Sequence, residues 1–207
     1  MERPSEGFTF ADSYKLSIDG KVTGTVRTKE RVQLGCVSTA AKAQLTGEGN
    51  FATNFETKPV VMRRATDHET ALLRRWARLF LVNHGIAQER VSELEMYVDV
   101  VDPGDGDALF VATFATTAYG QPGGAAFLIA RTTDVSATSV MPQYARFRER
   151  DTDSKDGVEP LFGAVDVDGD GVAELVTQRY HKEGYDYIIY RRGDGRWTSL
   201  SGGGSGC

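Results

Sequence analysis

The sequence predicts a mainly β protein with one long helix, an α+β fold built from antiparallel sheets. Most of the 207 residues fall into short apolar or alternating segments bounded by turns that contain Gly and Asp, which is typical of strands. One stretch, 66–84, instead repeats its apolar residues at helical spacing. A chain of this length can bury a good-sized core, so we expect one compact domain overall.

The net charge and the hydropathy pattern limit the classes of protein to which this chain can belong. The net charge of −5 argues against a nucleic-acid partner. No run of about 18 apolar residues occurs, so no transmembrane segment is expected. Residues 1–6 lack the apolar region of a signal peptide. The expected location is therefore cytoplasmic, or extracytoplasmic if this is a mature or trimmed chain.

The two cysteines, Cys36 and Cys207, are too few for a disulfide framework and do not form a metal-binding C-x-x-C motif. Cys36 lies in a strand-like segment and is expected to be a buried thiol. Cys207 ends the Gly- and Ser-rich segment 201–207, which we expect to be a flexible tail, either native or an engineered handle.

Residues 1–64 are predicted to form an N-terminal β-meander, in which Asp19-Gly20 is a hairpin turn. Its expected strands are 8–18, 22–27, 30–38 and 59–62.

A helical segment is predicted at 65–94. Thr66 and Glu69 match a capping box, and Gly85 is expected to end the helix. A short second helix is expected at 87–94. The apolar stripe of the first helix consists of Leu72, Leu73, Trp76, Leu79 and Phe80.

The most specific chemistry lies in the loop 166–174. Asp166, Asp168 and Asp170 alternate there, so a turn can direct all three carboxylates inward, while Gly169 and Gly171 allow a tight backbone. Val172 can add its backbone carbonyl, and Glu174 supplies a fourth carboxylate. Calcium prefers six to eight oxygen ligands, so the expected metal ligands are Asp166, Asp168, Asp170, Val172 and Glu174, with Ca²⁺ as the cofactor.

Two similar motifs are excluded by what surrounds the loop. An EF-hand needs a Glu at the twelfth loop position, where this chain has Thr177, and it needs flanking helices, whereas 161–165 and 175–179 are strand-like. A phosphatase-type Asp-x-Asp-x-Thr nucleophile would require Thr or Val at Asp170, and a long α/β domain after it.

The loop and the residues after it resemble the FG-GAP or VCBS repeat, the blade unit of integrin-like β-propellers. The resemblance implies a calcium site at the same five residues, and antiparallel blade-like sheets. The matching segments are 162–171, 174–176, 185–192 and 195–197, so the close match lies within residues 161–200.

A degenerate copy of this unit is predicted at 95–147, with a repeat of about 60 residues. Its loop keeps Asp102, Asp105 and Asp107. The loop is shorter than the second one, contains Pro103, and has Leu109 at the position that corresponds to Glu174. We expect a structural turn there, with weak metal binding as the alternative. Residues 148–160 are the expected linker. Two units do not close a propeller of roughly four to eight blades, which favours an incomplete propeller-like or β-sandwich-like arrangement.

The expected function is that of a calcium-binding β-scaffold or binding module without catalysis, whose partner is an unknown protein or glycan. One alternative is a hydrolase that uses the Asp and Glu cluster; another is an interaction protein with a vestigial, metal-free loop. An aromatic cluster is expected to pack across strands, or to offer a carbohydrate or peptide platform; it consists of Tyr180, Tyr185, Tyr187, Tyr190 and Trp197.

Overall fold

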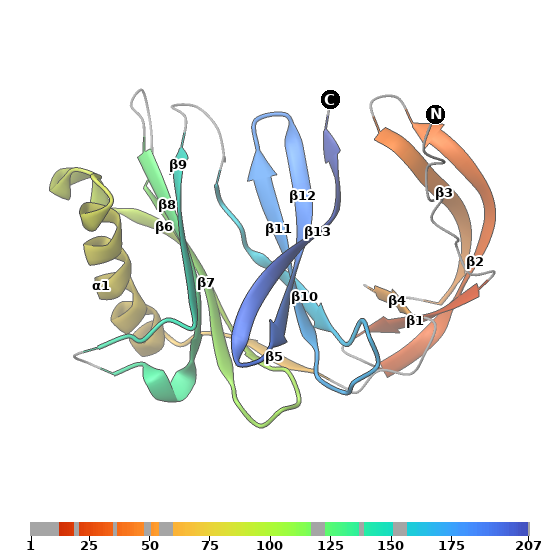
Figure 1. Cartoon of the computed structure of the whole chain (residues 1–207), viewed down its shortest axis with the longest axis horizontal. Coiled ribbons are helices and arrows are strands. Elements are labelled where there is room, and N and C mark those ends of the chain that lie inside the picture. Colours follow the sequence, from red (N-terminus) through yellow and green to blue (C-terminus); the bar gives the residue numbers. More distant parts are fainter. Residues whose placement is uncertain are drawn as a thin grey trace.

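The computed structural model describes residues 13–18, 21–34, 37–47, 51–53, 60–116, 123–136, 139–150 and 157–206. These residues form three antiparallel sheets and one α-helix, which confirms the predicted mainly β, α+β fold class (Figure 1). Cys36 and Cys207 lie outside the described residues. Among the described residues, neither α1 nor the two short 3₁₀ helices has the length and apolar character needed to span a bilayer.

The elements follow one another as β1 (Ser13–Ile18), β2 (Lys21–Leu34), β3 (Val37–Thr46), β4 (Phe51–Thr53), β5 (Val61–Arg64), α1 (Asp67–Asn83), η1 (Gln88–Val91), β6 (Leu94–Asp102), β7 (Leu109–Thr116), β8 (Gly123–Arg131), η2 (Thr132–Asp134), β9 (Tyr144–Arg150), β10 (Leu161–Val165), β11 (Glu174–His181), β12 (Gly184–Gly193) and β13 (Arg196–Gly206). The N-terminal sheet has the order β3-β2-β1-β4, the central sheet β5-β6-β7-β8-β9, and the C-terminal sheet β10-β11-β12-β13.

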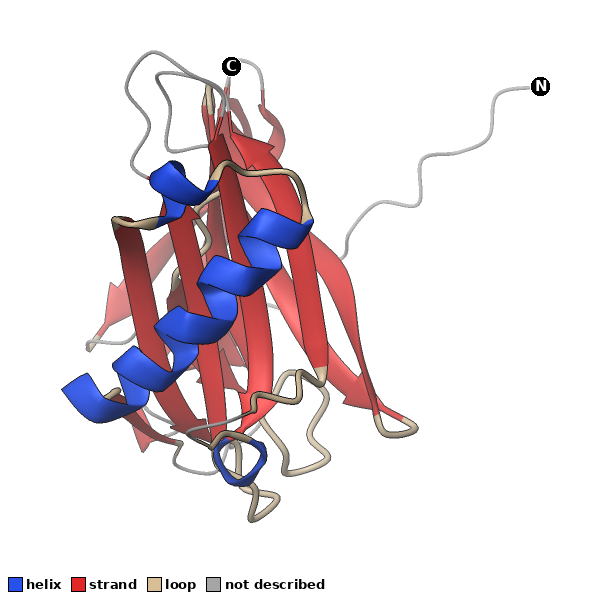
Figure 2. Cartoon of the chain, turned by 90° about the vertical axis from the view of Figure 1, so that its left-hand side faces the viewer, coloured by secondary structure: helices blue, strands red, loops and turns tan. Residues whose placement is uncertain are grey.

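The central sheet is covered on both faces. The helix α1 crosses one face, and the C-terminal sheet packs on the other, with the N-terminal sheet beyond it (Figures 1 and 2). Every residue of β7 is buried, which explains why its sequence is nearly continuously apolar instead of alternating. Phe110 and Phe114 of β7 pack toward the helix, whereas Leu109 and Val111 enter the core between the two sheets.

The central and C-terminal sheets share one strand order. Strands β6 to β9 and strands β10 to β13 are each four consecutive antiparallel strands, and in each set an acidic loop joins the first strand to the second. The central sheet gains β5 as an extra edge strand, because Val61–Arg64 pairs with Asp99–Asp102 of β6. The expected boundary at residue 64 thus falls after a strand that belongs to the central sheet.

The helix begins as predicted. Thr66 is its N-cap: the backbone N–H of Glu69 donates to the Thr66 hydroxyl (3.3 Å), and the Thr66 N–H donates to the Glu69 carboxylate (2.8 Å). Gly85 follows the helix with a φ of 89°, in the left-handed region expected of a C-terminal glycine. The predicted stripe is partly wrong, because Leu79 is 60% exposed and the buried helical residues are Leu73, Ala77 and Leu81.

We expect Glu69→Gln to lower the free energy of unfolding by about 1 kcal/mol at neutral pH, after allowance for solvent screening. The hydrogen bond from Arg63, together with those from Thr66, lowers the pKa of Glu69 from 4.5 to about 2, so the charged carboxylate favours the folded state. This stabilisation is present above pH 4.5 and is lost as pH falls toward 2. Urea unfolding at pH 7, 4 and 2.5 should therefore show the two proteins converging in acid. The exposed Glu93→Gln variant is the control, and a constant gap at all three pH values would contradict the prediction.

Two expectations about the C-terminal half are wrong. Strand β9 continues to Arg150, and residues 157–159, expected in a polar linker, are buried. They are buried because the backbone of 157–160 pairs with β11, where the N–H of Tyr180 donates to Val158 (2.9 Å). Residues 201–206, expected to be a flexible tail, form the second half of β13, since β12 extends to Gly184, which pairs with Gly206.

Candidate metal centre

Three acidic side chains meet where β10 turns into β11. Oxygen atoms of Asp166, Asp168 and Glu174 all lie within 4.8 Å of one another. The pairing of β10 with β11 sets this distance, because Val165 opposes Glu174 and so brings Glu174 beside the first residue of the loop. Asp166 and Glu174 are both 4% exposed, so two of the three carboxylates are almost fully buried.

The backbone of the loop holds these carboxylates in place. Gly169 and Gly171 have φ values of 82° and 87°, and their N–H groups donate to the two oxygens of Asp166 at 2.6 and 2.9 Å. The N–H of Val167 donates to Glu174 at 2.8 Å. Such positive φ values are readily adopted by glycine, which explains the glycines at these two positions.

The structure brings three of the five predicted ligands together. Asp170 is exposed and is not in the cluster, since its carboxylate accepts the N–H of Val172 at 2.7 Å. This is an Asx turn, and Asp168 forms a similar one with the N–H of Asp170 at 3.2 Å. Val172 thus contributes its N–H to the organisation of the loop. The donor set that could hold a metal ion is Asp166, Asp168 and Glu174.

A cation from the neighbouring strand reaches this cluster. Arg191 of β12 forms an ion pair with Asp168, and its Nε lies 3.8 Å from Glu174. Burial raises the pKa of Glu174, as do the charges of Asp168 and Asp170, while the Val167 N–H opposes the shift. The cluster therefore concentrates negative charge in a poorly solvated place, where a cation is favoured.

Sequence reasoning missed Arg191, although a signal was present. The turn at Lys182 and Glu183 joins β11 to β12 in a register that pairs Leu175 with Tyr190. The next residues outward, Glu174 and Arg191, then face each other across the two strands. Reading that register from the hairpin would have located the arginine beside the acidic loop.

Arginine side chains form ion pairs with the acidic residues of the first acidic loop, which joins β6 to β7. The Arg192 Nη1 lies 2.7 Å from Asp105 and 3.6 Å from Asp107, and the Arg131 Nε lies 3.0 Å from Asp107. Asp102 accepts the N–H of Gly104 at 3.0 Å, in a turn like those of the second loop. These ion pairs agree with the expected structural role of the first loop.

The two acidic loops also touch each other. The N–H of Ala173 donates to the carbonyl of Pro103 at 2.9 Å, and a side chain at Gly104 would meet the carbonyl of Gly171 at 3.3 Å. Adjacent arginines of β12 serve both loops, Arg191 the second and Arg192 the first. The loops are thus joined at one end of the packed sheets.

The predicted aromatic cluster divides into two groups. Tyr190 stacks on Phe127 (4.9 Å between ring centroids), and both belong with Trp197 to the core between the sheets. The remaining tyrosines form edge-to-face contacts along and across strands: Tyr180 with Tyr185 at 6.4 Å, Tyr185 with Tyr187 at 5.4 Å, and Tyr187 with Phe162 at 5.0 Å. The expected packing within the sheet is present.

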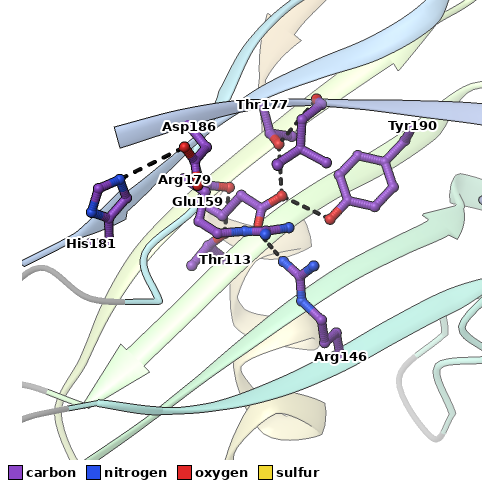
Figure 3. A network of polar contacts seen from close by, with 9 residues as sticks. Thr113, Arg146, Glu159, Thr177, Arg179, His181, Asp186 and Tyr190 are labelled. Atoms are coloured by element: carbon purple, nitrogen blue, oxygen red, sulfur yellow. Dashed lines mark hydrogen bonds and ion pairs between the residues drawn. The ribbon is translucent and has the colours of Figure 1, made fainter. Parts of the chain in front are cut away.

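A second polar cluster, which sequence analysis did not find, surrounds the buried Glu159 (Figure 3). One carboxylate oxygen accepts from the hydroxyls of Thr177 and Tyr190, both at 2.7 Å. The other accepts from Arg146 and, at 2.8 Å, from the Nε of Arg179. Burial and the nearby Glu159 charge raise the pKa of the Tyr190 hydroxyl. The surrounding charged and Gly-containing sequence indicated a solvated loop, so the sequence carried no signal for this burial.

Glu159 also links the two packed sheets. Its backbone carbonyl accepts from the Thr113 hydroxyl of the central sheet at 2.6 Å. Its side chain contacts β9 of the central sheet through Arg146, and β11 and β12 of the C-terminal sheet through Thr177, Arg179 and Tyr190.

No protein-family model matches the sequence, and neither a curated protein nor a solved structure matches it.

Proposed function

We propose that this protein is a calcium-binding β-scaffold or binding module of the FG-GAP or VCBS type, with a protein or glycan as its partner. The observation that carries the proposal is the convergence of Asp166, Asp168 and Glu174 within 4.8 Å. The three carboxylates offer only oxygen donors, which suit a hard cation, and calcium takes backbone and water oxygens as its further ligands. In this role the ion stabilises the junction of β10 and β11.

The arrangement of the strands supports the same class. Each of two sheets contains four consecutive antiparallel strands with an acidic loop after the first, as expected for a duplicated blade-like unit. The first loop has arginine partners on Asp105 and Asp107, whereas the second gathers three carboxylates, two of them buried, beside a single described arginine, Arg191. Calcium binding is therefore proposed for the second loop alone.

A second candidate is an interaction protein whose acidic loop works without metal. The observation in its favour is Arg191, which pairs with Asp168 and approaches Glu174. In this case the guanidinium is the permanent counter-ion of the second loop, as Arg192 is for the first.

Thermal unfolding in calcium, magnesium and chelator separates the two candidates. For a site with a Kd near 0.1 mM, 1 mM calcium stabilises the folded state by about 1.4 kcal/mol, which raises Tm by about 3–5 °C. We expect this rise with calcium and a smaller one with magnesium, because magnesium demands a stricter geometry.

The matched variants are Asp166→Asn in the second loop and Asp105→Asn in the first. We expect Asp166→Asn to remove the calcium-dependent rise and Asp105→Asn to retain it. Identical melting of the native chain in calcium and in chelator would overturn the calcium proposal and favour the metal-free loop.

A further inference from the structure

A row of arginines lies on the inner face of the edge strand β9. Arg146, Arg148 and Arg150 alternate along the strand and so share one face, opposite Phe127, Ala125 and Gly123 of β8. This face is turned toward the C-terminal sheet, because Arg146 reaches Glu159 there and a side chain on Gly157 would lie 3.4 Å from the Cβ of Arg148. Arg179 enters the same space from β11.

Among the described residues, the charges in this space do not balance. The described charged side chains with the largest effect on Arg148 are those of Arg179, Arg146 and Glu159, so three guanidinium groups, with Arg148 included, share one carboxylate and their formal charge is +2. Arg150 differs from Arg148, because its Nη1 donates to the carbonyl of Thr116 (2.6 Å) and lies 3.9 Å from Glu95.

Arg148 is the member of the row without a partner in the described part of the chain. No described residue accepts a hydrogen bond from its guanidinium or forms an ion pair with it, and the buried Nε atoms of Arg146 and Arg148 both lack an acceptor. Burial lowers the pKa of Arg148, and the charges of Arg179 and Arg146 lower it further. Partly buried cations gathered in this way are unfavourable unless an anion joins them.

We propose that Arg148, together with the N–H groups that Arg146 and Arg179 do not donate to Glu159, binds a dianionic oxyanion of the phosphate class. Guanidinium groups present forked donors that match phosphate oxygens, and a dianion cancels the excess of two positive charges. The side chains of Arg146 and Arg179 are 20% and 12% exposed, so this space is poorly solvated but open to water. The source is either free phosphate or the phosphate group of a larger ligand.

The test is a thermal unfolding titration of the full chain with inorganic phosphate in calcium-free buffer, at an ionic strength held constant with sodium chloride. We expect 20 mM phosphate to raise Tm by about 4 °C if the Kd is near 1 mM, and chloride to have no such effect. A parallel titration with a phosphomonoester, phosphoserine, identifies the source. A larger rise with phosphoserine indicates a phosphorylated ligand, and an equal or smaller rise indicates the free ion.

The decisive variant is Arg148→Gln, with the exposed Arg196→Gln as the control for loss of one charge. We expect Arg148→Gln to melt in chloride at or above the native Tm, because it relieves repulsion, and to lose the phosphate-dependent rise. Arg196→Gln should keep that rise. Equilibrium dialysis of phosphate against the native chain provides a measurement independent of the variants. Absence of a phosphate-specific rise in the native chain, or an unchanged rise in Arg148→Gln, would overturn the proposal.

Discussion

Replacing Glu159 with Gln is expected to destabilise the protein by about 3–5 kcal/mol and to lower its Tm by about 10 °C. The substitution keeps the shape of the side chain but removes the negative charge that Arg146 and Arg179 share. It also converts one acceptor oxygen into an amide nitrogen. Thr177 and Tyr190 donate to one oxygen of Glu159, and two arginines donate to the other. An amide nitrogen turned toward the arginines would meet donors that cannot accept, and one turned toward the hydroxyls would force both of them to give up their present hydrogen bonds as donors.

Urea and thermal unfolding measure this effect. Glu149→Gln is the control, because Glu149 is an exposed acid on the same strand as Arg146. Tyr190→Phe gives an intermediate point: it removes one donor to Glu159, and we expect it to cost about 1 kcal/mol. A loss below about 0.5 kcal/mol in Glu159→Gln would show that the network does not stabilise the packing of the two sheets.

Replacing Arg191 with Gln is expected to act oppositely on the metal-free and calcium-bound protein. Without metal, the variant loses the ion pair with Asp168. The arginine of this pair is about half exposed, so the expected decrease in the free energy of unfolding is below about 1 kcal/mol. With calcium, the ion no longer competes with a guanidinium for Asp168 and Glu174. We expect calcium to bind about tenfold more tightly, equivalent to about 1.4 kcal/mol.

Arg192→Gln is the matched control, because it removes the adjacent arginine of the same strand and affects the first loop through Asp105 and Asp107. A calcium titration measured by calorimetry should show the native affinity for calcium in this variant and a higher affinity for calcium in Arg191→Gln. Equal affinities in the two variants would show that Arg191 does not compete with the ion. No calcium binding in any of the three proteins would favour the metal-free candidate.

Features that depend on residues close together in the chain were predicted well. The capping box of Thr66 and Glu69 and the glycine after the helix require contacts within a few residues, and both are present. The strand-like segments 161–165 and 175–179, on either side of the second acidic loop, lie in β10 and β11. The clustering of Asp166 and Asp168 is local too, because the loop backbone binds both carboxylates.

The errors occur where the partner of a segment is distant in the chain. The segment 201–206 is Gly- and Ser-rich, yet it forms a strand because β12 supplies backbone partners that glycine can use as well as any residue. Glu159 lies in a charged stretch outside the strands, yet it is buried because Arg146, Arg179 and Tyr190 converge on it from β9, β11 and β12.

The sequence by itself determined the β-rich class, the position and N-terminal cap of the helix, and the loop that carries three of the acidic residues at the candidate metal centre. Periodicity, capping and turn chemistry act over a few residues, and these patterns are visible in one dimension. Only the tertiary structure decided which cation reaches each acidic loop, which acid is buried between the sheets, and which arginine of β9 lacks a partner among the described residues. Those outcomes depend on strand register and sheet packing, which bring together side chains that the linear sequence separates by dozens of residues.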